Sequence, residues 1–244
     1  MDKFLKYKFL RVDMNTFECI KTRRSIRKYT QQPVEFDKIA QIIEAGIHAP
    51  SAGNMQNWRF IVVTEKNLLK EIYQHCLHQE AVYNAQIAII VCGVTDKAEM
   101  LYGLRGKRLY TVQNCACAIQ NMLLAANELG LGACWIGAFD EDKISTVFGI
   151  PDNARPQAII TLGYPDEKPV SDRKNLESVT YFNRYKMKIK DLHLLFKDYS
   201  VHWEKQAEKV QEVSERGLKR VHKRLKEAWK KTKEHPKVRR FFKK

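Results

Sequence analysis

The sequence predicts one β-sheet with helices on its faces, because two kinds of segment alternate along the chain. Segments rich in β-branched and aromatic residues are followed by segments whose apolar residues recur at helical spacing. Hydrophobic residues make up 44% of the 244 residues, enough for a sizeable core. The chain has no apolar run long enough for a transmembrane helix, and its first residues are too charged for a signal peptide. We therefore expect a cytoplasmic protein.

Each expected element has a local signal. Asp140 is placed to N-cap a helix, and the near-continuous apolar run over 86–94 is typical of a strand buried on both faces. The expected strands are 58–64, 86–94, 133–137 and 155–164, and the expected helices are 35–48, 66–78, 109–129 and 141–148. Helix 109–129 is apolar nearly all round, so it should be central or at an interface. The polar segment 95–108 is expected to be a connection or a lid.

A basic cluster around one hydroxyl lies near the start of the chain. Arg23, Arg24, Arg27 and Lys28 surround Ser25. Charge-assisted hydrogen bonds from such a cluster suit a phosphate monoester. Taken alone, the cluster is more often a solvated basic turn.

A loop of small residues with two amides, Asn54 and Gln56, follows the first long helix. Small residues let backbone groups approach a flat, polar-edged ligand closely. In isolation, the two amides could instead satisfy the loop's own backbone. Together, the cluster and the loop suggest a phosphorylated cofactor.

The six cysteines lie in apolar surroundings, as buried reduced thiols do. Cys115 and Cys117 form a C-x-C pair, but no second pair lies at metal-ligand spacing, so no metal site is predicted.

The end of the chain is strongly basic. Residues 201–244 hold 16 Lys and Arg against 6 Asp and Glu, hence +10, whereas residues 1–200 carry +5. A narrow apolar stripe over 201–235 predicts a charged helix. Three roles stay open: packing against this chain or a partner subunit, a solvated helix, or binding to nucleic acid or an anionic membrane surface.

Four sequence blocks, in this order, resemble the nitroreductase family of FMN-dependent oxidoreductases. They are RRSIRKY, APSAGNMQNWRF, GLGACWIGAF and IPDNARPQAIITLGYP. The resemblance covers about residues 17–185. It implies an α+β fold with a central mixed sheet, and a homodimer with FMN at the subunit interface. The chain is then an arm over 1–16, an FMN-binding domain over 17–200 and a basic helical extension over 201–244.

The resemblance also implies which residues bind FMN. The phosphate and ribityl chain would contact Arg23, Arg24, Ser25 and Arg27, with Arg173 and Lys174 reaching the same phosphate. The loop that includes Pro50, Ser51, Ala52, Asn54 and Gln56 would contact the flavin of the partner subunit. Trp135, Ile136 and Gly137 would lie along the isoalloxazine.

The activity that the resemblance implies is electron transfer from NAD(P)H through the flavin to nitroaromatic, quinone or similar conjugated acceptors. Both substrates would use one site in turn, in a ping-pong cycle, and no catalytic side chain is required. The alternative is a flavin- or nucleotide-binding module whose basic helix binds nucleic acid or an anionic surface. Two residues depart from the family pattern: Asn57, where proline is frequent, and Asn114, where an acidic residue is common.

Overall fold

The computed structural model describes residues 14–187. The chain divides into two compact units, residues 1–171 and 172–244, and each is described by itself. The first unit holds the sheet and nearly all helices, whereas the described part of the second contains α8 (Leu176–Val179). The basic helix expected over 201–235 and most of the arm lie outside the described residues. The division into arm, domain and extension therefore stays a prediction.

The elements of the first unit follow the sequence pattern closely. In chain order they are α1 (Thr16–Thr22), α2 (Phe36–Ile47), η1 (Ala52–Asn54), β1 (Trp58–Val63), α3 (Lys66–His75), α4 (Glu80–Tyr83), β2 (Ile87–Val94), α5 (Asp96–Arg105), η2 (Gly106–Tyr110), α6 (Thr111–Glu128), β3 (Gly132–Ile136), α7 (Glu141–Phe148) and β4 (Ala154–Gly163). All four expected strands and all four expected helices are present. Asp140 caps α7 as predicted, because its side chain accepts the Lys143 N–H at 3.0 Å.

The four strands form one sheet in the order β1-β2-β4-β3, and all three strand pairs are antiparallel. The expectation of a mixed sheet is therefore wrong for the described strands. A near-continuous apolar strand indicates burial on both faces but not strand direction. The parallel contact that the structure does contain is an isolated bridge between Ser25 and Ala133.

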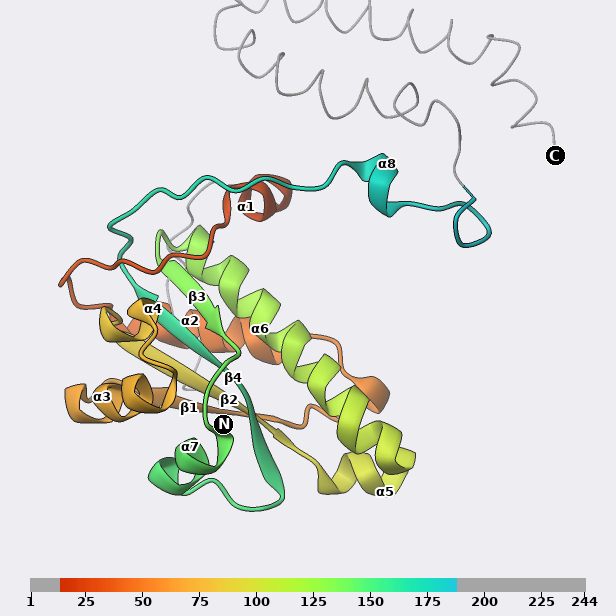
Figure 1. The fold of residues 1–244 in the computed structure, drawn as a ribbon, viewed down its shortest axis with the longest axis horizontal. Helices are drawn as coiled ribbons and strands as arrows, with labels where there is room; N and C mark the ends of the chain where they lie inside the picture. Colours follow the sequence, from red (N-terminus) through yellow and green to blue (C-terminus); the bar gives the residue numbers. More distant parts are fainter. Residues whose placement is uncertain (1–13, 188–244) are drawn as a thin grey trace, which may run out of the picture. The chain divides into compact units, whose positions relative to one another are not determined.

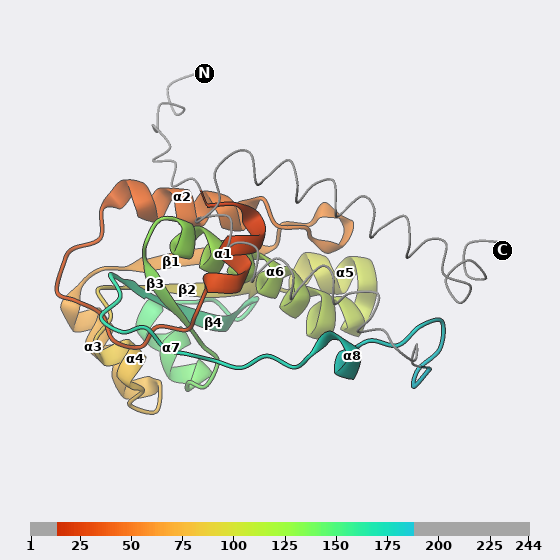
Figure 2. The same cartoon turned by 90° about the horizontal axis from the view of Figure 1, so that it is seen from above.

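The sheet is covered by a helix layer on each face. On one face Ile87, Ile89 and Val91 of β2 contact the core formed with α2 and α6. On the other face Ala88 and Ile90 join the core beneath α3, α4 and α7. Figures 1 and 2 show these layers, with α2 and α6 on the side opposite α3, α4 and α7. Each face of the sheet is therefore apolar, which explains the lack of polar alternation in β2.

The segment 95–108 differs from the expected connection or lid. Most of it is the helix α5, which continues through the π-helical turn η2 directly into α6. Met100, Leu101 and Leu104 of α5 are exposed, so the helix has no buried apolar stripe that would mark it in the sequence. None of the helices in the described part is long and apolar enough to cross a membrane.

Candidate functional site

The basic segment lies against the outer edge of β3. Ser25 forms a parallel bridge with Ala133, and the Ile26 N–H donates to the Ala133 carbonyl at 3.0 Å. The fit is close because Gly132 has no side chain: a Cβ there would lie 2.7 Å from the Ile26 side chain. The contact places the basic segment at Ala133 of β3, two residues before Trp135.

Tyr29 anchors the far end of this segment. Its hydroxyl donates to the Ile26 carbonyl at 2.6 Å and lies 2.8 Å from the Thr161 hydroxyl. Burial raises the pKa of Tyr29 well above its ordinary value, so the hydroxyl stays protonated and neutral. A Cβ on Gly163 would meet the Tyr29 side chain at 2.9 Å. Gly132 and Gly163 are register partners in the sheet, so this glycine pair makes room for the basic segment.

Glu167 fixes the backbone between the two ends. Its carboxylate accepts the N–H groups of Arg27 at 2.5 Å and Lys28 at 3.3 Å, and the Asp166 N–H donates to the Lys28 carbonyl at 2.9 Å. The side chain of Arg27 is thereby left exposed on a fixed backbone. No sequence signal distinguishes Glu167 from the other polar residues of its loop.

The predicted phosphate ligands differ in how they are engaged. Arg24 is used locally: its guanidinium donates to the carbonyls of Lys21 at 2.6 Å and Arg23 at 2.9 Å, at the end of α1. By contrast, the side chains of Arg23, Ser25 and Arg27 have no hydrogen-bond or ion-pair partner among residues 14–187. Two cations and a hydroxyl are therefore available to an anion at this edge.

Cys134 lies inside the same corner of the molecule. Burial raises the pKa of its thiol, an effect that Arg27 and Arg23 oppose and Glu167 reinforces. The thiol therefore stays protonated, and it is not a candidate nucleophile.

Trp135, Ile136 and Gly137 continue β3 beyond the docked segment. Trp135 is 39% exposed. Ile136 is buried in the core with α7, so only the backbone of Ile136 could face a ligand. Past Ala133, no described strand pairs with the outer edge of β3. This edge offers backbone polar groups and one exposed aromatic side chain to a flat molecule.

The second predicted part of the site is the loop 50–56, whose backbone is unusual. Gly53, Asn54 and Gln56 have φ angles of 55°, 51° and 47°, in the left-handed region. Such angles cost a residue other than glycine about 1 kcal/mol or more, so the surroundings must hold them. Within the loop, the Gln56 amide donates to Asn54 Oδ1 at 2.8 Å and the Gln56 N–H to Ser51 Oγ at 3.0 Å. Asn54 and Gln56 therefore form hydrogen bonds within the loop itself.

A buried chain of hydrogen bonds holds this loop. The Ala52 N–H donates to Asn114 Oδ1 at 2.9 Å, and Asn114 Nδ2 donates to Asn57 Oδ1 at 2.8 Å. Asn57 Nδ2 in turn donates to the Val94 carbonyl at 2.7 Å and to Thr111 Oγ1 at 3.1 Å. The two departures from the family pattern are therefore one bonded pair. Single positions in the sequence gave no sign of it.

Tyr102 of α5 lies against the same loop. A Cβ on Gly53 would lie 2.4 Å from the Tyr102 hydroxyl, the tip of an exposed side chain that can move away, so the φ angle of 55° is the main reason for glycine here. The segment 95–108 thus contributes to the loop's surroundings through a residue that the sequence did not single out.

The two parts of the predicted site lie at opposite ends of the sheet. The basic segment meets Ala133, which is paired with Leu162. At the other end Asn57, which directly follows the loop, accepts the N–H of Val94, and Val94 is paired with Ala154. From Ala154 to Leu162 a strand rises about 27 Å, at about 3.4 Å per residue. In Figure 1, α5 lies at the loop's end of the sheet and α4 at the other. One subunit therefore does not bring the two parts together.

Arg173 and Lys174 belong to the second unit, so their predicted contact with the phosphate stays a prediction. Among residues 14–187, no group of three or more His, Cys, Asp or Glu side chains could hold a metal ion.

Comparison with known proteins identifies the family to which this fold belongs. The model of the Nitroreductase family matches residues 20–164, which include the basic segment, the loop and β3. The chain belongs to the nitroreductase family. A putative NADH dehydrogenase/NAD(P)H nitroreductase of Methanothermobacter thermautotrophicus is 41% identical to this nitroreductase-family chain over 160 residues, covering 64% of it and 80% of the relative.

Solved structures of the nitroreductase family agree. A nitroreductase family protein from Clostridium difficile 630 has a TM-score of 0.63 at 31% identity, covering 70% of this chain and 99% of that one. An FMN-dependent nitroreductase from Clostridium difficile R20291 has a TM-score of 0.60 at 28% identity, covering 68% and 98%.

Proposed function

We propose that this protein is an FMN-dependent oxidoreductase that takes electrons from NAD(P)H and passes them to nitroaromatic, quinone or similar conjugated acceptors. The oxidoreductase class, FMN and NAD(P)H follow from membership of the nitroreductase family. The acceptor class and the alternating use of one site by both substrates are the proposal's finer part.

The residues at the edge of β3 fit the phosphate end of FMN. Arg23, Arg27 and the Ser25 hydroxyl have no partner among the described residues, and together they match a phosphate monoester in charge and in donor chemistry. The exposed part of Trp135 and the unpaired strand edge beyond Ala133 suit a flat ring system with polar edges.

FMN, when bound, supplies the hydride and electron chemistry. The protein then has to bind and orient the cofactor and neutralise its negative charge. Arg23 and Arg27 hold negative charge at the β3 edge, and Glu167 fixes the backbone that carries Arg27. Fixed cations placed before the reaction need no reorganisation when charge develops nearby. The Cys134 thiol does not serve as a nucleophile here, since it is buried and protonated.

We further propose that the protein acts as a homodimer, with each FMN between the basic segment of one subunit and the loop of the other. The observation that carries this is the separation of about 27 Å between the two parts along β4. A second copy is the simplest source of the missing half of each site.

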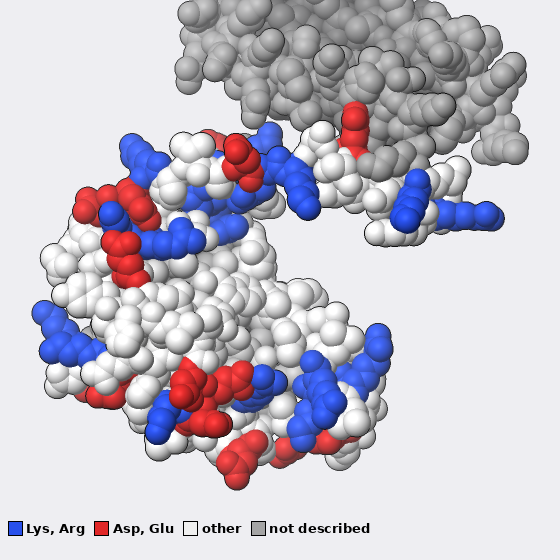
Figure 3. All heavy atoms as spheres, in the orientation of Figure 1, with Lys and Arg blue, Asp and Glu red and all other residues white. Residues whose placement is uncertain are grey.

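Exposed apolar side chains support a subunit contact on the α2 and α6 side of the sheet. Phe17 of α1, Ile47 of α2, Met100 and Leu104 of α5 and Val112 of α6 are all exposed. On the face that Figure 3 shows, charged side chains are few in the middle of the first unit. Apolar surface with few charges is typical of stable interfaces.

A spectroscopic test is direct. We expect the purified protein to be yellow or to bind added FMN, and to oxidise NADH or NADPH in the presence of a quinone. A colourless protein that binds no added FMN and oxidises neither nucleotide would refute the proposal.

A further inference from the structure

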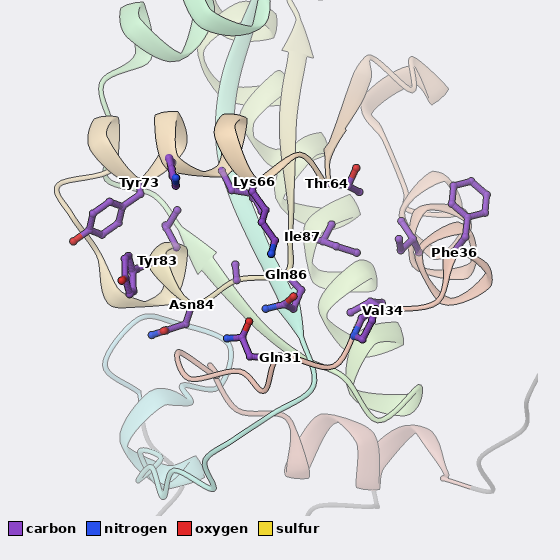
Figure 4. Close-up of a pocket in the computed structure, with 16 residues that line it drawn as sticks. Gln31, Val34, Phe36, Thr64, Lys66, Tyr73, Tyr83, Asn84, Gln86 and Ile87 are labelled. Atoms are coloured by element: carbon purple, nitrogen blue, oxygen red, sulfur yellow. The ribbon is translucent and has the colours of Figure 1, made fainter.

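A pocket of about 580 Å³ lies between α3, α4 and the segment that leads into α2 (Figure 4). It opens where β1 ends and β2 begins, whereas the basic segment lies on β3, at the other edge of the sheet. None of its lining residues belongs to the predicted FMN site. The pocket therefore needs its own explanation.

The inside of the pocket is apolar and aromatic. Leu69, Val82 and Ile87 are buried beneath it and belong to the protein core. Tyr73 and Tyr83 stand on one side with ring centroids 5.3 Å apart. A volume of this size and such a lining are usual for sites that bind small organic molecules.

The rim of the pocket is cationic. Lys66 and Lys70 lie one turn apart on α3, and both line the opening. Neither forms an ion pair with any residue in the range 14–187, and no Asp or Glu lines the pocket. Two unpaired cations above an apolar floor favour an anionic group on the ligand.

The side-chain amides of two glutamines complete the lining of the pocket. Figure 4 shows Lys66 extending across the pocket towards Gln86, with Gln31 on the same side. The side-chain amides of Gln31 and Gln86 have no hydrogen-bond partner among the described residues. They can donate to an anion or accept from a polar ring edge.

We propose that this pocket is a binding site for a small amphipathic anion, a planar apolar body that carries a carboxylate or a phosphate. Lys66 and Lys70 bind the anionic group, while Tyr73 and Tyr83 contact the ring system. The site does not depend on the proposed flavin chemistry, because it shares no residue with it.

The test uses pyridoxal 5′-phosphate as an affinity probe on the full chain saturated with FMN. Its aldehyde condenses with a lysine amine and releases water, and borohydride then reduces the imine for peptide mapping. At limiting probe, we expect Lys66 or Lys70 to be labelled at least about five-fold more than Lys97 and Lys143. These controls are exposed helix lysines outside the pocket, also without an ion-pair partner among the described residues. Pyridoxine 5′-phosphate should suppress the labelling, and pyridoxine, which lacks the anion, should not.

A measurement of non-covalent binding complements the labelling experiment. Titration of pyridoxine 5′-phosphate by calorimetry should show about ten-fold weaker binding to the Lys66→Ala/Lys70→Ala variant and unchanged binding to Lys97→Ala/Lys143→Ala. All four side chains are exposed, so both variants should fold. Uniform labelling of surface lysines, or equal affinity of the two variants, would overturn the proposal. A protein that binds no FMN but labels Lys66 selectively would refute the flavin function and leave this site standing.

Discussion

At the scale of single residues, Asn114 determines the conformation of the loop 50–56. It is 3% exposed, accepts the Ala52 N–H and donates to Asn57. A buried amide with both ends bonded can hold a backbone in the strained φ region that Asn54 and Gln56 adopt. The family pattern showed Asn57 and Asn114 only as two separate departures. A hydrogen bond between residues 57 positions apart cannot be recognised from the sequence around either residue.

We expect Asn114→Ala to lower the free energy of unfolding by about 2–3 kcal/mol, since the Ala52 N–H and Asn57 Oδ1 would be left buried without partners. Hydrogen exchange followed by mass spectrometry should show faster exchange of the amides in 51–56 and unchanged exchange in β2.

Asn121→Ala is the matched control for this variant. Asn121 is on the same helix, two turns after Asn114, and donates to the Ala45 carbonyl of α2 at 3.1 Å instead of to the loop. The Asn121→Ala variant should show the same hydrogen exchange of the amides in 51–56 as the wild type. Equal exchange of the loop in the wild type and Asn114→Ala would contradict the role given to Asn114.

At the scale of elements, the seating of the basic segment on β3 depends on Gly132. A Cβ at this position would come within 2.7–2.9 Å of three Ile26 side-chain atoms, and Ile26 is itself 8% exposed with little room to move. We expect Gly132→Ala to cost about 1–3 kcal/mol of unfolding free energy by overpacking. Urea denaturation measures this.

Gly137→Ala serves as the comparison, because the nearest atom to its Cβ would be Trp135 Nε1 at an ordinary 3.6 Å. Its midpoint in urea should lie close to that of the wild type. If the two alanine variants were equally stable, the close seating of Ile26 on Gly132 would be wrong.

A second link between elements joins the start of α7 to β4. Arg155 binds Glu141 with two hydrogen bonds, of 2.6 and 2.7 Å, and this lowers the pKa of Glu141. A lowered folded-state pKa stabilises the fold above the ordinary glutamate value of 4.5, and the contribution is lost as pH falls through the lowered value. Both side chains are largely exposed, so the contribution is about 0.5 kcal/mol.

Glu141→Gln should therefore be about 0.5 kcal/mol less stable than the wild type at pH 7, and the difference should vanish in acid. Urea denaturation at a series of pH values measures it. A difference that stays constant down to low pH would show that the charge of Glu141 is not its source.

The sequence predicted the elements far better than their arrangement. Period and capping located α2, α6 and α7 to within two or three residues, because their buried faces are regular. The helix α5 was missed because its apolar residues point outward. Strand direction was also missed, because a doubly covered strand has the same composition in either orientation. Glu167 and Tyr102 reach the site through backbone bonds and steric fit, and neither contact leaves a residue pattern.

At the scale of the whole molecule, one sequence stretch supplies both parts of the proposed site, and the two parts lie far apart. Residues 23–27 and 50–56 are separated by α2 and end up at opposite ends of the sheet. One end offers the side chains of Arg23 and Arg27, which have no partner among residues 14–187. The other end offers the exposed loop residues Gly53, Asn54 and Gln56. A twofold assembly would complete two sites at once.

Mixed dimers test this central claim most directly. One subunit carries Arg23→Ala/Arg27→Ala and the other Asn54→Ala/Gln56→Ala, each with its own tag, and FMN per dimer is measured by absorbance after tandem purification. In the mixed dimer one site would combine both defects and the other would be intact, so we predict one FMN per mixed dimer, two per wild-type dimer and almost none in either variant homodimer. A mixed dimer without FMN, beside a wild-type dimer that holds two, would show that each site lies within one subunit and would contradict the account.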